Sequence, residues 1–245
     1  MQERDYNVLA RGRTATGVAV DEGLRSYMLR VYNYMALGVA WTAIVALFMV
    51  LTPALMMTVA VGPMKWVLFV ALLGLGWFAP RIIFSGNAAS AWLAYGVYAT
   101  LWGVLISPMI AYFLGADQAD TVVRALLITA ITFGATSLAG YVTKKDLSGF
   151  AGFFFMASIG ILIAIVVNAL FIHSTLMSLI TSIITVLVFA GVTAWETQTI
   201  KQLYYEGDLP AAARSKAIFG AFVLYGSFIT LFIHILNILG IMSED

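Results

Sequence analysis

Seven long apolar runs, separated by short polar breaks, occupy the chain from residue 31 to residue 240. Apolar residues are continuous within each run and do not alternate with polar ones, so the pattern predicts helices and argues against the strands of a barrel. A helix needs about 20 apolar residues to cross the hydrocarbon core of a bilayer. We therefore predict membrane-spanning helices at about 31–53, 66–84, 89–113, 121–143, 149–171, 174–196 and 216–240.

The composition agrees with this pattern, since 62% of the residues are hydrophobic, 10% are charged and the mean hydropathy is +0.97. A soluble domain is about one quarter charged. The fold class predicted is an all-α integral membrane protein with one transmembrane domain, 31–240. Residues 1–30 have mixed charge and lack the apolar core of a secretory signal, so we expect a cytoplasmic N-terminal tail. Residues 241–245 form a short C-terminal tail.

The basic residues are distributed unevenly between the two ends of the predicted spans. If the N-terminus is cytoplasmic, 11 of the 13 Lys and Arg residues lie on the inner side, and only Lys65 and Arg124 lie outside. Cytoplasmic loops carry an excess of Lys and Arg. The bias predicts a cytoplasmic N-terminus, an external C-terminus and an odd number of spans.

The last span carries a stripe of polar residues. Ser227, Thr230, His234 and Asn237 are spaced so that they share one helix face. Polar groups within a membrane are costly, which favours a last helix enclosed by the other six. Two interpretations remain open, namely hydrogen bonds that hold neighbouring helices together and the wall of a water-lined path. For His234 the alternatives are a proton relay and an interhelical hydrogen bond.

A carboxylate and a guanidinium lie at the inner ends of two other predicted spans. Glu196 ends the sixth span and Arg81 ends the second, after Pro80. Equal depth allows an ion pair between them, and such a pair would keep the carboxylate charged. The alternative is that Glu196 simply emerges into cytoplasmic water.

Several classes of function are disfavoured by what the sequence lacks. It has no cysteine and only two histidines, His173 and His234, which excludes Cys-based zinc sites and multi-histidine metal centres. No nucleotide-binding, metalloprotease or serine-hydrolase motif is present. We predict neither an enzyme nor a nucleic-acid-binding protein, and no cofactor.

Three stretches resemble a known family. They are YVTKKDLSGF at 141–150, FAGVTAWETQ at 189–198 and GAFVLYGSFITLF at 220–232. Together with residues 27–32 they resemble the transmembrane Bax inhibitor motif (Bax inhibitor-1-like) family, in its bacterial form. The resemblance implies seven helices, six of them in two layers around a central seventh, in a bacterial inner membrane. It also implies a pH-sensitive calcium leak in which two aspartates share a proton near the cytoplasmic face.

The sequence departs from the family at both gating positions. Glu196 stands where the family has the first aspartate, and Ser227 stands where it has the second. A shared proton requires two carboxyl groups, and calcium prefers six to eight oxygen ligands, so Glu196 with Ser227 and Thr230 is a weak calcium candidate. Arg81 stands near the latch arginine of some bacterial members. We expect a cation leak, intact or degenerate; the alternative is a non-conducting regulator that binds a membrane-anchored ATP-dependent protease through its N-terminal tail.

Overall fold

The computed structural model describes residues 2–243, with side chains from Glu22 onward. Seven of the helices in that part of the chain are long and apolar enough to cross a membrane, which confirms the predicted fold class. The elements are α1 (Gln2–Leu51), α2 (Pro53–Met56), η1 (Met57–Val61), α3 (Met64–Ile83), α4 (Ala88–Gly115), α5 (Ala119–Val142), η2 (Ser148–Phe150), α6 (Ala151–Val167), η3 (Asn168–Ile172), α7 (Thr175–Gln202) and α8 (Pro210–Ser243).

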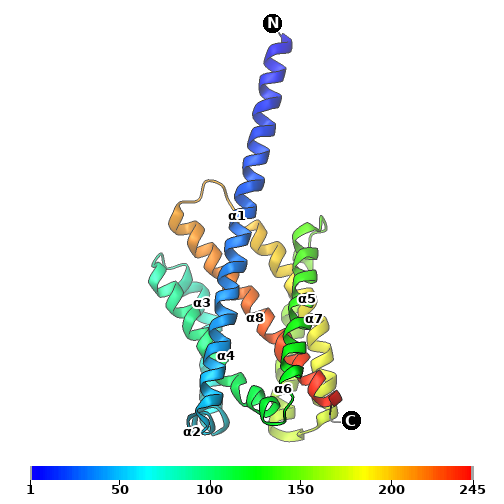
Figure 1. Ribbon diagram of the computed structural model, residues 1–245. Coiled ribbons are helices and arrows are strands. Elements are labelled where there is room, and N and C mark those ends of the chain that lie inside the picture. The colour runs from blue at the N-terminus through cyan, green and yellow to red at the C-terminus, as the bar shows by residue number, and fades with distance from the viewer. Residues whose placement is uncertain (1, 244–245) are drawn as a thin grey trace.

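Helix α8 lies between two groups of helices (Figure 1). Helices α1, α3 and α4 pack together on one side, α5, α6 and α7 pack together on the other, and α8 contacts members of both groups. In the most apolar stretch of α8, 67% of the residues are buried, against 6–28% in the other spans. Within the polar stripe of this helix, Ser227 is buried and Thr230, His234 and Asn237 are partly buried.

Helix α1 continues from the tail into the first span without a break. The membrane-spanning part begins at Glu22, and Tyr27, Met28 and Val31 are already buried against the bundle. We expected a boundary between tail and span at residue 30, but the helix continues through this position without a break. The side chains of residues 1–21, where most of the predicted tail lies, are outside the described part of the structure.

Helix α7 is longer than its apolar run indicates. It continues six residues beyond Glu196, to Gln202, and α8 begins at Pro210, so the connection is shorter than the loop expected over residues 197–215. Helix α7 continues past Glu196 because Thr197 and Gln198 are buried and bonded to other segments. Glu196 consequently lies within a helix and not at its end.

The turns use local polar groups where the sequence breaks. Asn87 caps α4 by accepting a hydrogen bond from the Ala89 N–H at 2.9 Å, and Ser174 caps α7 by accepting one from the Met177 N–H at 3.2 Å. The Asn168 side chain bridges the short turn before α7 by bonding to both backbone polar atoms of Ser174. This turn makes α6 and α7 antiparallel neighbours.

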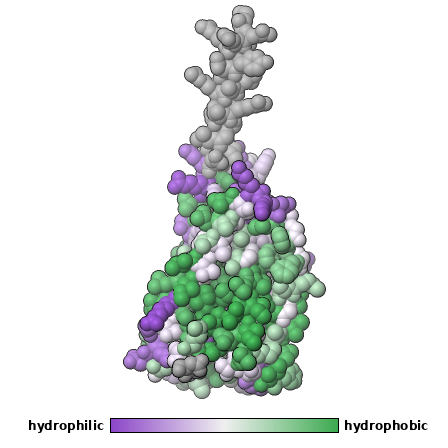
Figure 2. All heavy atoms as spheres, turned by 90° about the vertical axis from the view of Figure 1, so that its right-hand side faces the viewer, coloured by the Kyte–Doolittle hydropathy of each residue, from purple (hydrophilic) through white to green (hydrophobic). Residues whose placement is uncertain are grey.

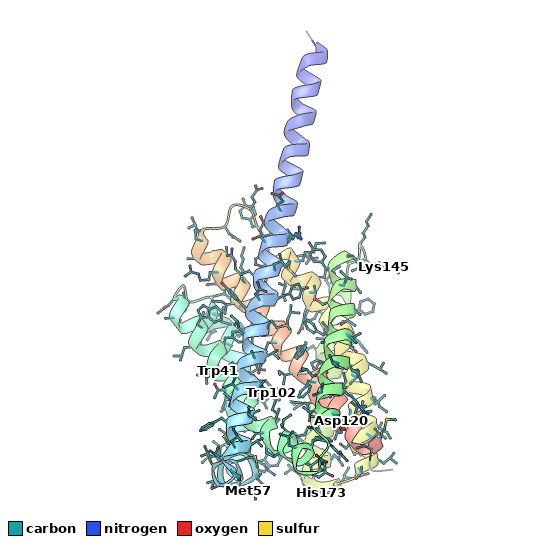
Figure 3. All side chains as sticks on the ribbon, viewed as in Figure 1. Trp41, Met57, Trp102, Asp120, Lys145 and His173 are labelled. Carbon is teal, nitrogen blue, oxygen red and sulfur yellow. The ribbon has the colours of Figure 1, made fainter. Side chains whose placement is uncertain are left out.

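The surface and the two ends of the bundle differ in chemistry. Figure 2 shows a broad hydrophobic face, and large apolar side chains such as Trp77 and Phe171 are 76% exposed, as expected of groups that face lipid. Lys145 lies at the end beyond which α1 projects, whereas Met57 and His173 lie at the opposite end (Figure 3). We call the first end the basic end because the helix directions place there Arg81, Lys144, Lys145, Lys201 and Lys216.

Candidate functional site on the α7–α8 interface

The central contact of the site joins a carboxylate to a hydroxyl. Ser227 on α8 donates a hydrogen bond to Oε2 of Glu196 on α7, with 2.6 Å between the oxygens. Ser227 is 2% exposed, and Glu196 is partly buried. Sequence reasoning placed both residues near the inner mouth, and the structure brings them into direct contact in the half of the bundle nearer the basic end.

Close packing of α5 on α7 sets the position of Glu196. Gly140 faces the backbone of Ala194, where any side chain would overlap the Ala194 carbonyl group. Just beyond it, Thr197 and Ser137 share a hydrogen bond of 2.9 Å, and Ser137 bonds to Tyr32 of α1 at 2.7 Å. This chain of hydroxyls ties three helices together one residue after Glu196.

Arg81 does not pair with Glu196. Arg81 is exposed near the end of α3, and within residues 22–243 the ion pairs are Arg124–Asp120 and Lys216–Asp208. In the same residues the one hydrogen bond of the Glu196 carboxyl is that from Ser227. The hypothesis of an arginine latch has no supporting contact, because the Arg81 side chain leaves the bundle at the basic end.

The rest of the α8 stripe also turns toward α7, with one exception. His234 Nδ1 lies 2.9 Å from the Ser182 hydroxyl, and Asn237 donates to Ser178 at 2.9 Å and to Ser182 at 2.8 Å. Thr230 instead donates to the Gly226 carbonyl of its own helix at 2.9 Å. Three of the four stripe residues therefore form interhelical hydrogen bonds.

Ser178 and Ser182 were not singled out from the sequence. A signal for them exists, because residues 178, 182, 185, 193 and 197 are hydroxyl residues that recur at helical spacing along α7. Their run is the counterpart of the stripe on α8. Taken together, the polar face of α7 and the polar stripe of α8 would have predicted that these two helices pack against each other.

A second group that sequence reasoning left unassigned holds the turn between α5 and α6. The Gln198 side chain accepts from the Leu147 N–H and donates to the Lys145 carbonyl, both at 2.8 Å. Lys201 donates to the Tyr141 carbonyl at 2.8 Å. The two Gln198 bonds join two of the stretches that carry the family resemblance, 141–150 and 189–198.

Asp146 shapes the same turn from outside the membrane-spanning segments. Its Oδ1 accepts a hydrogen bond from the Ser148 N–H at 2.9 Å. Hydrogen bonds from the Ser148 backbone and side chain favour the charged form and hold the pKa of this exposed carboxyl below its usual value. Asp146 therefore acts as a local cap and lies apart from the Glu196 contact.

Two cavities adjoin the half of the stripe that is farther from the basic end. The larger, about 490 Å³, lies among α3, α4, α6, α7 and α8, and both Thr230 and His234 line it. The smaller, about 230 Å³, is more polar and is lined by Asn168, Ser182, His234 and Asn237 among others. His234 thus stands between an apolar space and a polar one.

The described residues contain no group of three His, Asp or Glu side chains that could hold a metal ion. Glu196 brings one carboxylate and Ser227 one hydroxyl, far fewer than the oxygen ligands that calcium prefers. A tightly bound resident calcium therefore does not fit this contact. A passing cation needs only transient interaction with such a group.

Comparison with known proteins identifies the family. The family model described as inhibitor of apoptosis-promoting Bax1 matches residues 24–244. The chain belongs to the Bax inhibitor-1-like family. The match covers the whole transmembrane domain, including the turn at Asp146 and the Glu196–Ser227 contact.

Three of the similar proteins come from bacteria. An uncharacterized protein of Rickettsia prowazekii is 38% identical over 236 residues, which cover 93% of this chain and 94% of the relative. An uncharacterized protein of Deinococcus radiodurans is 38% identical over 219 residues, covering 88% and 90%. The inner membrane protein YbhL of Escherichia coli strain K12 is 36% identical over 221 residues, covering 89% and 92%. The likeness therefore extends over nearly the full length of each chain.

Proposed function

We propose that this protein is a pH-sensitive leak for calcium or a similar cation across a bacterial inner membrane, with Glu196 as its gating group. The observation that carries the proposal is the Ser227–Glu196 hydrogen bond, which closes the α7–α8 interface on the side of the basic end. From the positive-inside rule we infer that this end faces the cytoplasm. The inner-membrane location is favoured by the relative YbhL, which is named an inner membrane protein.

A single carboxyl supplies the pH sensitivity in this proposal. One proton gained or lost changes the charge of the contact by one unit, and a carboxylate attracts a cation that a neutral acid does not. Among the described residues, Ser227 is the hydrogen-bond donor to the Glu196 carboxyl. Because the family's second acid is absent, we expect a weaker dependence on pH than a pair of carboxyl groups would give.

The test is calcium flux into proteoliposomes between about pH 5 and pH 8. Glu196→Gln keeps the volume of the side chain and a hydrogen-bond acceptor but removes the titratable group. The pH dependence of the flux should therefore disappear, whether or not the magnitude of the flux changes. Glu206→Gln is the matched control, because Glu206 is exposed in the connection between α7 and α8. Absence of wild-type flux at every pH in this range would refute the leak.

The reciprocal variant restores the missing acid. Ser227→Asp places a second carboxyl beside Glu196, and two like charges at hydrogen-bond distance cannot both ionise freely. The flux should then depend more steeply on pH than in the wild type. An unchanged profile would show that the contact does not control permeation.

A second candidate function is regulation of a membrane-anchored ATP-dependent protease. The observation that favours it is the projection of α1 beyond the bundle at the basic end (Figure 1). Deleting residues 2–21 leaves the packing of Tyr27 on Tyr204 in place. A partner protease that binds the full chain but not this deletion would support regulation, and equal binding by both would refute it.

A further inference from the structure

The smaller of the two cavities has a polar wall near the end of the bundle opposite the basic end. Six of the ten described residues that line it have polar side chains, namely Asn168, Ser178, Thr181, Ser182, His234 and Asn237. Helix α7 begins two residues after His173, which lies at that end (Figure 3), and Ser178 is in its first turn. Asn237 is six residues, or about 9 Å, from the end of α8. The cavity therefore extends from near the membrane surface into the α7–α8 interface.

One end of the Asn237 side-chain amide is available to this space. The bonds of Asn237 to Ser178 and Ser182 are made by the same amide atom, and the other amide atom has no hydrogen-bond partner among residues 22–243. That atom is not enclosed, because the one enclosed side-chain nitrogen or oxygen without a partner in this range belongs to Trp102. Asn237 lines the smaller cavity, so its free amide atom faces the cavity, whichever of the two amide atoms is the oxygen.

The imidazole of His234 also has one free nitrogen. Nδ1 lies 2.9 Å from the Ser182 hydroxyl, and Nε2 has no partner in the described part of the chain. By the same criterion as for Asn237, Nε2 is not enclosed. His234 lines both cavities, so Nε2 faces open space in one of them, and in either tautomer it can form one more hydrogen bond. Two groups of the stripe therefore have hydrogen-bonding capacity that the described residues do not use.

Water is the occupant that fits these groups. An internal site holds water where it is roomy enough and offers each molecule about two to four polar partners. A cavity of about 230 Å³ has room for several water molecules, and its six polar side chains supply the partners. A lipid chain in the same space would leave the Asn237 amide without a partner in an apolar surrounding, which is costly. The chemistry of the wall therefore favours water over hydrocarbon.

The same wall suits a cation that keeps part of its hydration shell. Among the described residues that line the cavity none is Asp, Glu, Lys or Arg, and the oxygens are those of hydroxyl and amide groups. Neutral oxygens of this kind can replace some of the water around an ion without holding it tightly. We propose that the smaller cavity is a water-filled vestibule, open on the outer face of the membrane opposite the basic end, through which a hydrated cation enters the leak. The entry of a cation rests on the proposed function, whereas the presence of water does not.

The vestibule is tested by the accessibility of single cysteines, because the chain has none of its own. Ser178→Cys and Thr181→Cys each place one thiol in the cavity wall. Intact bacterial cells that express the full-length variants are treated with a positively charged, membrane-impermeant methanethiosulfonate, and unreacted thiols are then counted with a maleimide after denaturation. Both variants should react, because a thiol in contact with water forms the reactive thiolate. Absence of reaction at both positions would overturn the proposal.

Two variants at similar depth are the controls. Ile180 lies next to Thr181 on α7, but it is 49% exposed and does not line the cavity, so it faces lipid. Ser107 is 0% exposed, lines neither cavity and lies eight residues, or about 12 Å, from the end of α4. A thiol in either place stays protonated, so Ile180→Cys and Ser107→Cys should react about tenfold more slowly than Thr181→Cys, or slower still. Equal rates at all these positions would overturn the vestibule.

The side of the membrane is tested with Lys145→Cys, because Lys145 is exposed at the basic end (Figure 3). This thiol should be protected in intact cells and should react once the membrane is disrupted. Reaction at Lys145→Cys in intact cells, with Ser178→Cys and Thr181→Cys protected, would overturn an opening on the outer face.

The entry of the cation is tested by flux after modification. A positive charge attached at Ser178→Cys repels an approaching cation, so calcium flux into proteoliposomes should fall about threefold or more. The wild-type chain has no thiol, and the same treatment should leave its flux unchanged. Unchanged flux through fully modified Ser178→Cys would overturn entry by this route. Reaction at Ser178→Cys and Thr181→Cys, together with absence of wild-type flux at any pH, would instead confirm the vestibule and refute the leak.

Discussion

The substitution Gly140→Ala tests the α5–α7 contact that positions Glu196. The added methyl carbon would lie 2.7 Å from the carbonyl carbon of Ala194 and 2.8 Å from its Cα. Carbon atoms in contact are normally about 3.5–4.0 Å apart, so the helices must separate by about 1 Å. The obstacle is backbone, which cannot rotate away as a side chain could.

The cost follows from what that separation breaks. Overpacking of this kind costs about 1–3 kcal/mol. The Ser137–Thr197 hydrogen bond, 2.9 Å long and less than one helical turn from Gly140, would be stretched beyond bonding distance, which adds about 1 kcal/mol. Replacing Gly by Ala within a helix stabilises the helix by up to about 1 kcal/mol, which offsets part of this loss. We expect a net loss of about 2 kcal/mol in the free energy of unfolding.

Gly134→Ala is the matched control on the same helix. Gly134 has nothing within 4 Å of an added Cβ, so only the gain in helix propensity remains, and stability should be equal or up to about 1 kcal/mol higher. Denaturant unfolding in detergent micelles, followed by circular dichroism, measures both variants against the wild type. Equal effects of the two substitutions would refute the inference that α5 and α7 pack backbone to backbone at this point.

Three further predictions concern the turn at the basic end and the buried hydroxyl groups. Gln198→Ala removes two hydrogen bonds to the turn and should cost about 2 kcal/mol and speed amide exchange there, whereas Gln202→Ala, at an exposed position one turn on, should do neither. Because the folded-state pKa of Asp146 is lowered, its stabilisation is present above its usual pKa near 3.8 and is lost as pH falls through the folded value. The stability difference between wild type and Asp146→Asn should therefore shrink from about pH 5 to about pH 2 in chemical unfolding, and a constant difference would contradict this role. Tyr225→Phe removes the 2.6 Å bond to Thr42 but leaves the Thr42 bond to a backbone carbonyl, so unfolding titrations should show a loss of only about 1 kcal/mol, and a loss several times larger would contradict this account.

The membrane-spanning helices are predictable from sequence because the bilayer imposes one strong rule. Backbone polar groups cannot be left exposed to lipid, so every long apolar run must form a helix. The same rule does not predict the end of α7 at the basic end, because the helix continues to Gln202 through residues that belong to no apolar run. There the helix is stabilised by specific partners, such as the bonds of Gln198 to the 145–147 turn, and hydropathy carries no information about partners.

The candidate site was predictable in its residues but not in its pairings. Helical spacing is enough to place Ser227, His234 and Asn237 on one face of α8. Whether Glu196 meets Ser227 or Arg81 depends on how α7 rotates and slides against α8, and that is set by packing across several helices. Membrane depth, which suggested Arg81 as a partner, does not specify which way an exposed side chain points.

The polar contacts between α7 and α8 are interrupted, and this limits where a leak could be controlled. Glu196–Ser227 lies on one side of the gap and Ser182–His234 on the other. Between them Thr230 donates a hydrogen bond to its own helix, its one side-chain bond among residues 22–243, and borders the large apolar cavity. A cation that has passed Glu196 must still cross this stretch, where desolvation is costly unless water enters. In the proposed leak, opening the carboxylate contact would therefore not suffice for conduction, because the cavity would also have to be wetted, and an apolar occupant there would act as a second barrier.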